Sequence, residues 1–442
     1  MKAHAPGSSL RFALIVLDGV GDRPCPVLGG KTPLEAARTP HLDGLAERGE
    51  LGLAYPVGQG VAPESDAGVL GLLGYDPEAD YPGRGVLETE GLGIRLREGE
   101  VAFRANFATF SRDGGILDQR VGRSLGTDEA RKLATALADP ESLADRGVRV
   151  RVLATVGHRA VVILSPPSAR PFSSLVSNSD PFYQKLGGMG KAVSVKDPRP
   201  LPVRPLGTSA DARWTAECAN LFLDTVGPRL REHPVNLARR ERSLLEANGL
   251  LLRDAGVPTD RDLSFSKRWG LPGRALTEMP VERGIARLLG MDDLYVGPLD
   301  PATRDEGLRE RARQCAAALR PGELLYIHLK GPDEPGHDGK AGLKREVIEA
   351  IDRSFFGPLL RGVDLTTTRI LVTADHATPC TLKGHSDDPV PVLVGGGDVR
   401  GGPVRRAQRF TEVDARGGSL GTLTGKAILR SLLEGTPRSH VP

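Results

Sequence analysis

Acidic and histidine residues follow apolar, β-branched runs at two widely separated places in the chain. Asp18 follows Phe12–Leu17, and Asp375 with His376 follows Ile370–Thr373. Such runs are typical of buried strands in a mostly parallel sheet. Because ligands bind where the carboxyl ends of strands meet in an open α/β sheet, we expect these side chains to lie at one edge of a sheet. The pattern therefore predicts an α/β fold with a polar site at that edge.

Further residues of the same kinds extend this predicted site. Asp333 and His337 lie four residues apart, and His385 follows the second run closely. Burying titratable groups without partners costs several kcal/mol, so the pair after Ile370–Thr373 favours a functional role. Together these residues supply enough oxygen and nitrogen ligands for two divalent metal ions, and mixed Asp/His ligation suits Mn²⁺ or Zn²⁺ better than Mg²⁺ alone. A site of this kind indicates phosphate-ester chemistry.

Each residue also has an ordinary structural interpretation. Asp18 is followed by glycines and is compatible with a turn that caps a helix. Asp333 and His337 are compatible with a polar surface loop around Pro335 and Gly336. The combination of these acidic and histidine residues indicates a metal site more specifically than any one of the residues does.

Ser65 is the candidate nucleophile. It lies where a short helix is predicted to begin, so the structural alternative is a helix N-cap, a position where serine is common. The two roles are compatible, because a helix N-terminus favours a developing alkoxide and binds phosphate oxygens.

Arginines lie beside glycines and aromatic residues in the segment that follows. Arginine binds carboxylate and phosphate groups with two parallel hydrogen bonds. The ordinary alternative is that many of them are simply solvated surface residues, and Lys330 is a weaker candidate of the same kind. The candidate substrate-binding residues are Arg84, Arg104, Asn106, Arg120, Arg123, His158, Arg159 and Lys330.

The composition excludes several classes of protein. The 442 residues allow two to three domains, and the net charge of +3 does not favour nucleic-acid binding. The four cysteines have no paired spacing, as expected in a reducing cytoplasm. The longest apolar run near the N-terminus, Phe12–Leu17, is too short for a signal peptide or a membrane span. The predicted partner is a small phosphorylated substrate, and the oligomeric state stays open.

The order of predicted elements indicates two domains. A helix is expected around Leu42–Arg48, and strands at Gly249–Arg253, Leu324–Leu329 and Val390–Val394, with a long helix at Leu343–Leu360. Between them the chain becomes rich in glycine, with short strands at Val101–Phe110 and Ala160–Leu164 and an amphipathic helix at Asp211–Arg231. We therefore expect a discontinuous metal-binding domain (residues 1–75 and 240–442) and an inserted smaller α+β domain (76–239).

The combined motifs resemble those of the archaeal-type cofactor-independent phosphoglycerate mutases of the alkaline phosphatase superfamily. The likeness runs from about Phe12 to the C-terminal region. It rests on Leu-Asp-Gly-Val-Gly-Asp-Arg-Pro, Thr-Pro-Leu-Glu-Ala-Ala-Arg-Thr-Pro, Ser65-Asp66, Gly74-Tyr75-Asp76-Pro77, Gly-Arg-Gly at 83–85, Arg-Ala-Asn-Phe-Ala-Thr at 104–109, Gly-His-Arg-Ala-Val at 157–161, Gly-His-Asp at 336–338, Asp375-His376, and His385-Ser-Asp-Asp-Pro-Val-Pro.

The resemblance implies an alkaline-phosphatase-like, mostly parallel sheet flanked by helices, and an activity. Ser65 would take the phosphoryl group of 3-phosphoglycerate, and the reoriented glycerate would take it back on its 2-hydroxyl. No bisphosphoglycerate would be needed. The arginines would retain the glycerate and exclude water. By motif, one metal would be surrounded by Asp18, Ser65, Asp375 and His376, and the other by Asp333, His337 and His385.

The chain departs from the family pattern beside the nucleophile. Archaeal members typically read Gly-Ser-Asp-Thr-Ala-His, whereas this chain reads Glu64-Ser65-Asp66-Ala67-Gly68-Val69. The alternative function is therefore a related metal-dependent phosphotransferase or phosphatase that acts on another small phosphorylated hydroxy acid or amino alcohol. A non-enzymatic metal-binding or scaffolding protein is the other class, and it would have no need for a serine at a helix start beside so many metal-type ligands.

Overall fold

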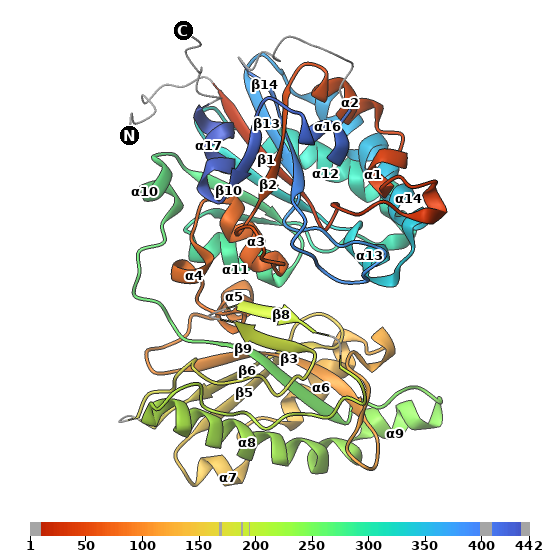
Figure 1. Ribbon diagram of the computed structural model, residues 1–442. Helices are drawn as coiled ribbons and strands as arrows, with labels where there is room; N and C mark the ends of the chain where they lie inside the picture. Colours follow the sequence, from red (N-terminus) through yellow and green to blue (C-terminus); the bar gives the residue numbers. More distant parts are fainter. Residues whose placement is uncertain (1–9, 168–169, 187–188, 194, 398–408, 435–442) are drawn as a thin grey trace. The chain divides into compact units, whose positions relative to one another are not determined.

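The chain folds into two compact units in a computed structural model that describes residues 10–167, 170–186, 189–193, 195–397 and 409–434. Unit 1 comprises residues 1–80 and 263–442, and unit 2 comprises residues 81–262 (Figure 1). Unit 1 is thus discontinuous in sequence. The sequence-based boundaries, at 75 and 239, place the return to unit 1 too early, because the segment up to residue 262 belongs to unit 2.

Unit 1 is built on an eight-stranded sheet in the order β11-β10-β12-β1-β13-β14-β2-β15. The central strand β1 (Arg11–Leu17) lies between β12 (Leu324–Leu329) and β13 (Thr368–Thr373) and is parallel to both. Only β14 is antiparallel to its neighbours β13 and β2, so the predicted mostly parallel sheet is confirmed. The outer strands are β11 (Asp292–Tyr295), β10 (Gly273–Thr277), β14 (Val390–Gly396), β2 (Glu50–Tyr55) and β15 (Gly421–Thr424).

Helices cover both faces of this sheet (Figure 1). One group consists of α3 (Ser65–Leu72), α11 (Pro280–Leu288) and α17 (Lys426–Glu434). The other group contains α2 (Pro40–Ala46), α12 (Arg304–Ala318) and α14 (Ala341–Ile351). The smaller helices are α1 (Pro33–Ala36), α4 (Pro77–Asp80), α10 (Phe265–Trp269), α13 (Asp333–Asp338), α15 (Gly357–Gly362) and α16 (Glu412–Arg416).

The predicted helix at Leu343–Leu360 is observed as a continuous helical run with an irregular middle. After α14 the chain makes one π-helical turn, Asp352–Phe356, and continues as α15. Asp352 accepts hydrogen bonds from the backbone nitrogens of His41 and Leu42, at 3.2 and 2.8 Å. The π turn therefore provides an acceptor for the free N–H groups at the start of α2.

Unit 2 contains a five-stranded antiparallel sheet in which β3 (Val101–Phe110) pairs with β4 (Ile116–Asp118), β6 (Arg159–Ser165) and β9 (Gly249–Gly256). Strand β5 (Arg149–Ala154) lies beyond β6. The expected strand at Gly249–Arg253 is present as β9, but it joins this sheet instead of the parallel one. A separate hairpin consists of β7 (Tyr183–Leu186) and β8 (Met189–Ala192).

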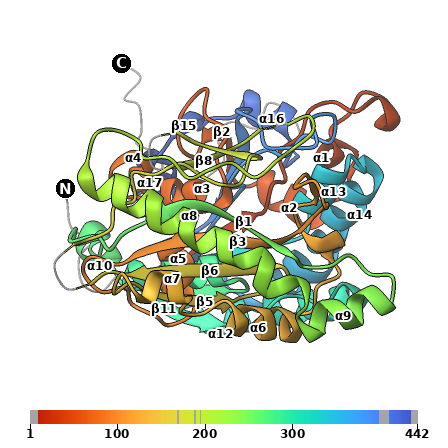
Figure 2. The same cartoon turned by 90° about the horizontal axis from the view of Figure 1, so that it is seen from below.

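Helices pack on both faces of the unit 2 sheet. The long helix α8 (Ala210–Arg231) covers one face together with α6 (Thr127–Ala136) and α7 (Glu141–Ala144), as Figures 1 and 2 show. Helix α5 (Arg84–Gly91) lies on the other face against β3 and β9, and α9 (Pro234–Glu241) follows α8. The amphipathic helix expected at Asp211–Arg231 is thus part of the core of unit 2 and does not return the chain to unit 1.

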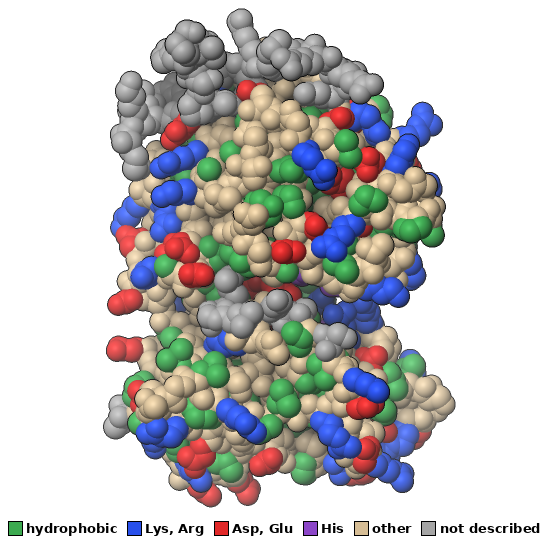
Figure 3. Space-filling model, in the orientation of Figure 1, with side chains coloured by type: hydrophobic (Ala, Val, Ile, Leu, Met, Phe, Trp, Pro, Cys, Tyr) green, Lys and Arg blue, Asp and Glu red, His purple; other side chains and the backbone are tan. Residues whose placement is uncertain are grey.

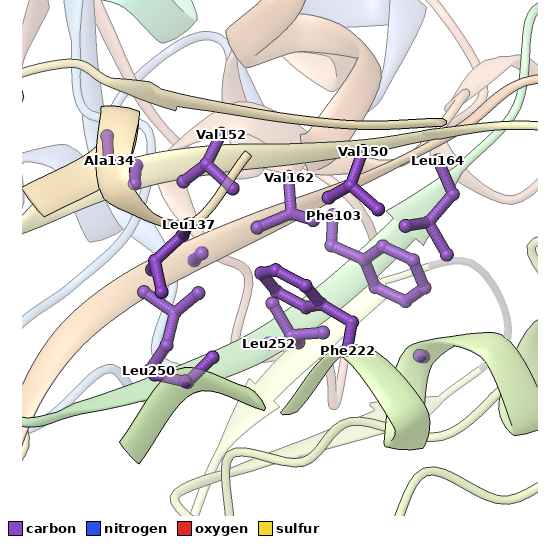
Figure 4. Packing of buried hydrophobic residues seen from close by; sticks show 14 of the residues in the cluster. Phe103, Ala134, Leu137, Val150, Val152, Val162, Leu164, Phe222, Leu250 and Leu252 are labelled. Atoms are coloured by element: carbon purple, nitrogen blue, oxygen red, sulfur yellow. The ribbon is translucent and has the colours of Figure 1, made fainter. Parts of the chain in front are cut away.

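The hydrophobic core of unit 2 lies between α8 and the sheet (Figure 4). Phe222 of α8 packs among Phe103, Val162 and Leu252, which come from three neighbouring strands. Burial of aromatic and branched aliphatic side chains contributes roughly 1.5–3 kcal/mol each. This core makes β3, β6 and β9 a firm support for the polar side chains that alternate with it on the opposite face.

The surface is polar and of mixed charge. On the face shown in Figure 3, basic and acidic side chains are intermixed, with hydrophobic side chains scattered between them. Among the described helices there is none with the length and apolar character that crossing a membrane requires.

Candidate functional site

Three neighbouring parallel strands of unit 1 end at the same level. The register of β1 places Leu17 beside Leu329 of β12 and Val16 beside Thr373 of β13. The residues that come next along each strand are the predicted ligands: Asp18 follows β1, the Asp333 segment follows β12, and Asp375 and His376 follow β13. The sheet therefore brings these side chains together at its carboxyl edge, as expected from the sequence.

Ser65 lies at this edge, at the first position of helix α3. The N-cap residue is Glu64, so the alternative role of Ser65 as an N-cap is wrong. The Ser65 hydroxyl instead lies 3.1 Å from Nε2 of His376. Helix α3 approaches the β13 loop closely at Gly68, where a Cβ atom would lie 2.3 Å from the carbonyl oxygen of Asp375. The small residue that follows Ser65 by one turn thus lets the helix present the serine to the acid cluster.

Asp333, His337 and His385 form one candidate ligand group. Nε2 of His337 lies 3.5 Å from Asp333 Oδ2, and Nε2 of His385 lies 3.6 Å from Asp333 Oδ1. Nδ1 of His385 is 2.9 Å from the carbonyl oxygen of Pro63, which can only accept a hydrogen bond. This contact directs Nε2 of His385 towards the other members of the group.

Asp18, His376 and Asp375 form a second part of the same cluster. Nε2 of His376 lies 3.6 Å from Asp18 Oδ1 and 3.3 Å from Asp375 Oδ2. Its ring stacks on that of His385 with centroids 3.8 Å apart, so the two parts are adjacent. Asp333 also lies within reach of Asp18 and His376. The structure therefore brings all of the predicted metal-binding residues into one continuous cluster.

The buried carboxylates leave acceptor atoms without hydrogen-bond donors. Among the described residues, Asp18 Oδ1 and Asp375 Oδ2 are buried and accept no hydrogen bond. Such atoms are costly unless a cation or a donor faces them. Two carboxylate oxygens directed at histidine nitrogens are an oxygen and nitrogen donor set that fits a divalent transition metal.

The pKa values in the cluster show that carboxylates and imidazoles stabilise one another's charged forms. Burial alone would raise the pKa of Asp375, but the charges of His376 and His328 hold it well below the usual range. Burial likewise opposes the shift at Asp333, whose pKa is lowered by the hydrogen bond and charge of His385. Despite burial, Glu64 and Asp333 raise the pKa of His385 to about 10. The carboxylates are thus held in the ionised form in which they could ligate divalent ions, which would supply positive charge when bound.

His328 is a member of the cluster that the sequence did not reveal. It lies within β12, and its Nε2 is 3.7 Å from Asp18 Oδ1 and 3.4 Å from Asp375 Oδ2. Although burial and Lys330 oppose the shift, Asp375 and Asp18 raise the pKa of His328 to about 10. A single histidine inside the apolar run of β12 was the available signal, because a buried titratable side chain needs a partner.

Lys330, predicted to bind substrate, is already paired with two carboxylates. Its ammonium lies 3.1 Å from Asp18 Oδ2 and 2.9 Å from Glu282 Oε1. Glu282 is a buried acid in the first turn of α11 and is a second residue that the sequence did not reveal. Lys330 therefore balances part of the negative charge at the edge of the cluster.

Arginines gather on the sheet of unit 2. Arg104 and Asn106 belong to β3, where Arg104 lies beside Arg253 of β9 and Asn106 beside Arg159 of β6. Arg253 was not among the predicted residues. Arg104 Nε and Asn106 Oδ1 are buried and have no hydrogen-bond partner among the described residues. Both atoms are available to a ligand that offers acceptors and donors.

The arginines of unit 2 influence one another electrostatically. Burial and the charges of Arg84 and Arg253 lower the pKa of Arg104 to about 9. Glu88 offsets part of this charge, at 3.4 Å from Arg84 Nε and 3.2 Å from Arg104 Nη1. Burial also lowers the pKa of His158 to about 3, together with the charges of Arg159, Arg104, Arg120 and Arg123. The predicted residues of unit 2 therefore lie near enough to one another for the arginine charges to act on Arg104 and His158.

The loop that carries Arg120 and Arg123 is strained. Val121 and Arg123 have φ values of 53° and 55°, in the left-handed region that non-glycine residues rarely adopt. Fully buried Arg239 supports this loop by donating hydrogen bonds to the carbonyl oxygen and hydroxyl of Ser124, at 3.3 and 2.7 Å. Strained backbone held in this way is concentrated at ligand sites.

Comparisons with known proteins agree with one another. Residues 46–236 match a family model described as 2,3-bisphosphoglycerate-independent phosphoglycerate mutase. Relatives bearing that name include proteins from Aeropyrum pernix (42% identical, covering 94% of this chain and 97% of the relative) and Methanoculleus marisnigri (39% identical, covering 97% and 98%).

Solved structures of similar proteins span the same length. A cofactor-independent phosphoglycerate mutase from Thermoplasma acidophilum is 32% identical, with a TM-score of 0.58 over 96% of this chain and 99% of that one. A protein from Pyrococcus horikoshii is 29% identical, with a TM-score of 0.74 over 97% and 98% of the two chains. The similarity thus extends over both units.

Proposed function

The chain belongs to the 2,3-bisphosphoglycerate-independent phosphoglycerate mutases, and from this premise we propose that it is an isomerase that interconverts 3-phosphoglycerate and 2-phosphoglycerate. The proposal is supported most directly by the position of Ser65. Its Oγ atom lies 3.1 Å from His376 Nε2, at the edge of the cluster of carboxylates and histidines. A phosphatase or phosphotransferase acting on another small substrate is not favoured, because the named relatives cover almost the whole chain.

In the proposed reaction, Ser65 is the nucleophile. Its oxygen forms a bond to the phosphorus of 3-phosphoglycerate while the bond to the C3 oxygen breaks, and that oxygen takes up a proton. The glycerate then turns, its C2 oxygen forms a bond to the same phosphorus, and the bond to Ser65 breaks. Ser65 loses its hydroxyl proton in the first step, which balances the proton that the C3 oxygen takes up. The proton released by the C2 hydroxyl in the second step returns to the Ser65 oxygen as its bond to phosphorus breaks. The position of Ser65 at the start of α3 adds the favourable end of the helix dipole for the phosphoryl oxygens.

The acid and histidine cluster is proposed to hold two divalent metal ions, with Mn²⁺ favoured over Zn²⁺ and Mg²⁺. One would be held by Asp18, Ser65, Asp375 and His376, and the other by Asp333, His337 and His385. The buried oxygens Asp18 Oδ1 and Asp375 Oδ2 face histidine nitrogens without completing a hydrogen bond to them, which supports such ligation. When bound, the ions would supply Lewis-acid stabilisation of the charge that develops on the phosphoryl oxygens.

The arginine cluster of unit 2 is proposed to bind the carboxylate and phosphate of the substrate. The candidates from the sequence are Arg84, Arg104, Asn106, Arg120, Arg123, His158 and Arg159, and the position of Arg253 beside Arg104 adds it to them. The arginine charges, which together with burial lower the pKa values of Arg104 and His158, support an anionic ligand. Retaining the glycerate by such contacts would make transfer faster than hydrolysis.

The experiment that tests the function uses 3-phosphoglycerate, added Mn²⁺ and no bisphosphoglycerate, followed by ³¹P nuclear magnetic resonance. Appearance of 2-phosphoglycerate is expected. Release of inorganic phosphate without isomerisation would assign the chain to the phosphatases, and absence of any reaction would contradict an enzymatic role.

The reaction would place the protein in glycolysis and gluconeogenesis. We also propose a cytoplasmic location. The four cysteines support a reducing compartment, since Cys25, Cys218, Cys315 and Cys380 are all unpaired and buried.

A further inference from the structure

Thr378 connects the two parts of the acid and histidine cluster through its hydroxyl group. The hydroxyl donates a hydrogen bond to Asp333 Oδ1 at 2.7 Å, and its oxygen lies 3.1 Å from Nδ1 of His376. An ionised carboxylate offers only acceptors, so the single hydroxyl proton is directed to Asp333. The oxygen of Thr378 is then the acceptor for an N–H at Nδ1 of His376.

This arrangement selects one tautomer of His376. With the proton on Nδ1, the lone pair on Nε2 is free. Nε2 is the nitrogen that faces Ser65 Oγ, at 3.1 Å, and Asp18 Oδ1, at 3.6 Å. The hydroxyl of Thr378 thus acts on two residues at once: it orients a carboxylate oxygen of Asp333, and it accepts the Nδ1–H of His376, which points the Nε2 atom at Ser65 and Asp18.

The backbone of Thr378 is held firmly in place. The residue is completely buried. Its N–H donates to the carbonyl oxygen of Gly21 at 2.9 Å, and its own carbonyl oxygen accepts a hydrogen bond of 2.9 Å from Lys344 Nζ. Lys344 is also buried and donates to Gly21 O at 3.1 Å and to Asp22 Oδ2 at 2.8 Å. The loop after β1 and helix α14 therefore clamp Thr378 from both sides.

Gly19 packs closely against the hydroxyl of Thr378 and the carboxylate of Asp333. A Cβ atom on Gly19 would lie 2.5 Å from Thr378 Oγ1 and 2.7 Å from Asp333 Oδ1, and the φ of Gly19 is 58°. Glycine at this position is therefore required by both space and conformation. The hydroxyl, the carboxylate and the imidazole occupy one defined arrangement.

We propose that Thr378 is a positioning residue that fixes the tautomer of His376 and the orientation of Asp333, so that both present metal-ligating atoms. The role rests on the proposed metal-dependent function. Residues that orient metal ligands in this way typically change metal affinity about 10–100-fold when they are removed.

The test measures Mn²⁺ binding to the metal-free full chain by isothermal titration calorimetry. Thr378→Val keeps the shape but removes the hydroxyl, and about 10–100-fold weaker binding is expected. Thr378→Ser keeps the hydroxyl and should restore affinity close to that of the wild type. Thr373→Val is the matched control, because Thr373 is also buried but its hydroxyl donates to the carbonyl oxygen of Pro391, at 3.0 Å.

A second readout reports the tautomer directly. In protein labelled with ¹⁵N-histidine, His376 is expected to carry its proton on Nδ1 in the wild type and in Thr378→Ser, and to lose this preference in Thr378→Val. Thr378→Ala is measured in parallel, so that a poor fit of valine cannot explain a loss, and melting temperatures show that each variant folds.

Two results would overturn the positioning role. One is a Mn²⁺ affinity in Thr378→Val and Thr378→Ala that equals that of the wild type. The other is a loss of Mn²⁺ affinity in Thr378→Ser as large as the loss in Thr378→Val. If the wild type isomerises 3-phosphoglycerate and Thr378→Val binds Mn²⁺ normally, the positioning role alone fails. A wild type that neither binds Mn²⁺ nor isomerises the substrate would remove the proposed function, and the role of Thr378 with it.

Discussion

Ser65 and His376 lie far apart in the sequence, yet the Ser65 hydroxyl is 3.1 Å from the imidazole Nε2. Ser65→Ala is expected to abolish turnover with little effect on folding, since the hydroxyl does not cap α3. Ser65→Thr should be weakly active, because it keeps the oxygen but adds a methyl group to a crowded site. After an acid quench with substrate, mass spectrometry should find phosphate on the peptide that contains Ser65.

A buried serine in another part of unit 1 provides the control. The Ser431 hydroxyl donates within α17 to the carbonyl oxygen of Ile428, at 2.6 Å, so Ser431→Ala should retain activity. Near-normal turnover by Ser65→Ala, or phosphate on a different residue, would rule out the phosphoserine mechanism.

Removal of divalent metal should abolish activity, and Mn²⁺ should restore it. Metal that binds only the folded state also raises the melting temperature, with a stabilisation of about 2.7 kcal/mol at a hundredfold excess over Kd. Asp375→Asn removes the charge of a buried carboxylate in the cluster and should largely abolish the rise in melting temperature on adding Mn²⁺. Full activity in protein shown by elemental analysis to contain no metal would contradict the metal-dependent mechanism.

Loss of one cation from the unit 2 cluster should mainly reduce kcat/KM. For Arg159→Ala or Arg120→Ala, loss of a charge-assisted contact is expected to cost on the order of 2–3 kcal/mol of transition-state stabilisation. More inorganic phosphate per turnover should also be released. Arg149→Ala is the matched control, since the exposed Arg149 of β5 pairs with Asp139. Wild-type kinetics in both variants would show that this cluster does not retain the substrate.

The neutral state of His158 should make unit 2 sensitive to acid. Burial, together with Arg159 and its neighbours, lowers the pKa of His158 to about 3 from an ordinary value of 6.5. The unfolded chain therefore binds a proton between pH 6.5 and 3 that the folded chain does not bind. The stability present above pH 6.5 is lost as the pH falls through this range.

His158→Gln removes this linkage, so its thermal unfolding should depend less steeply on pH between 6.5 and 4 than that of the wild type. In the wild type, 3-phosphoglycerate should raise the pKa of His158 in nuclear magnetic resonance titrations, because a bound anion offsets the surrounding arginines. An ordinary pKa for His158 in the free protein would contradict the description of the cluster.

The sequence was sufficient to predict the central strands and the polar residues that follow them. Runs such as Phe12–Leu17 of β1 and Ile370–Thr373 of β13 are apolar and contain β-branched residues, and a strand end with Asp and His has no packing explanation. The motif set also identified the family, which the full-length relatives confirm. The strand and ligand predictions depended on local pattern, and the family prediction depended on the resemblance of the whole motif set.

The sheet to which β9 belongs could not be predicted from the sequence, because it depends on which strand β9 pairs with in the folded protein. An apolar run such as Gly249–Arg253 has the same appearance in a parallel sheet and in a buried antiparallel one. Pairing with β3 places it in unit 2, moves the boundary to residue 262 and brings Arg253 beside Arg104. His328 was missed for a related reason: within a strand, the sequence does not indicate which acid lies across from a buried imidazole.

The central position of β1 has a consequence for synthesis on the ribosome. Its two neighbours supply Leu324 and Arg369 to flank Phe12, so β1 has no sheet to join until most of the chain has been made. Unit 2, by contrast, is continuous in sequence, and its strands find their partners within residues 81–262. Domains generally fold as units during translation, and nascent apolar strands are prone to aggregation. Unit 2 is therefore expected to fold first, while the apolar Phe12–Leu17 segment depends on chaperones until β12 and β13 emerge.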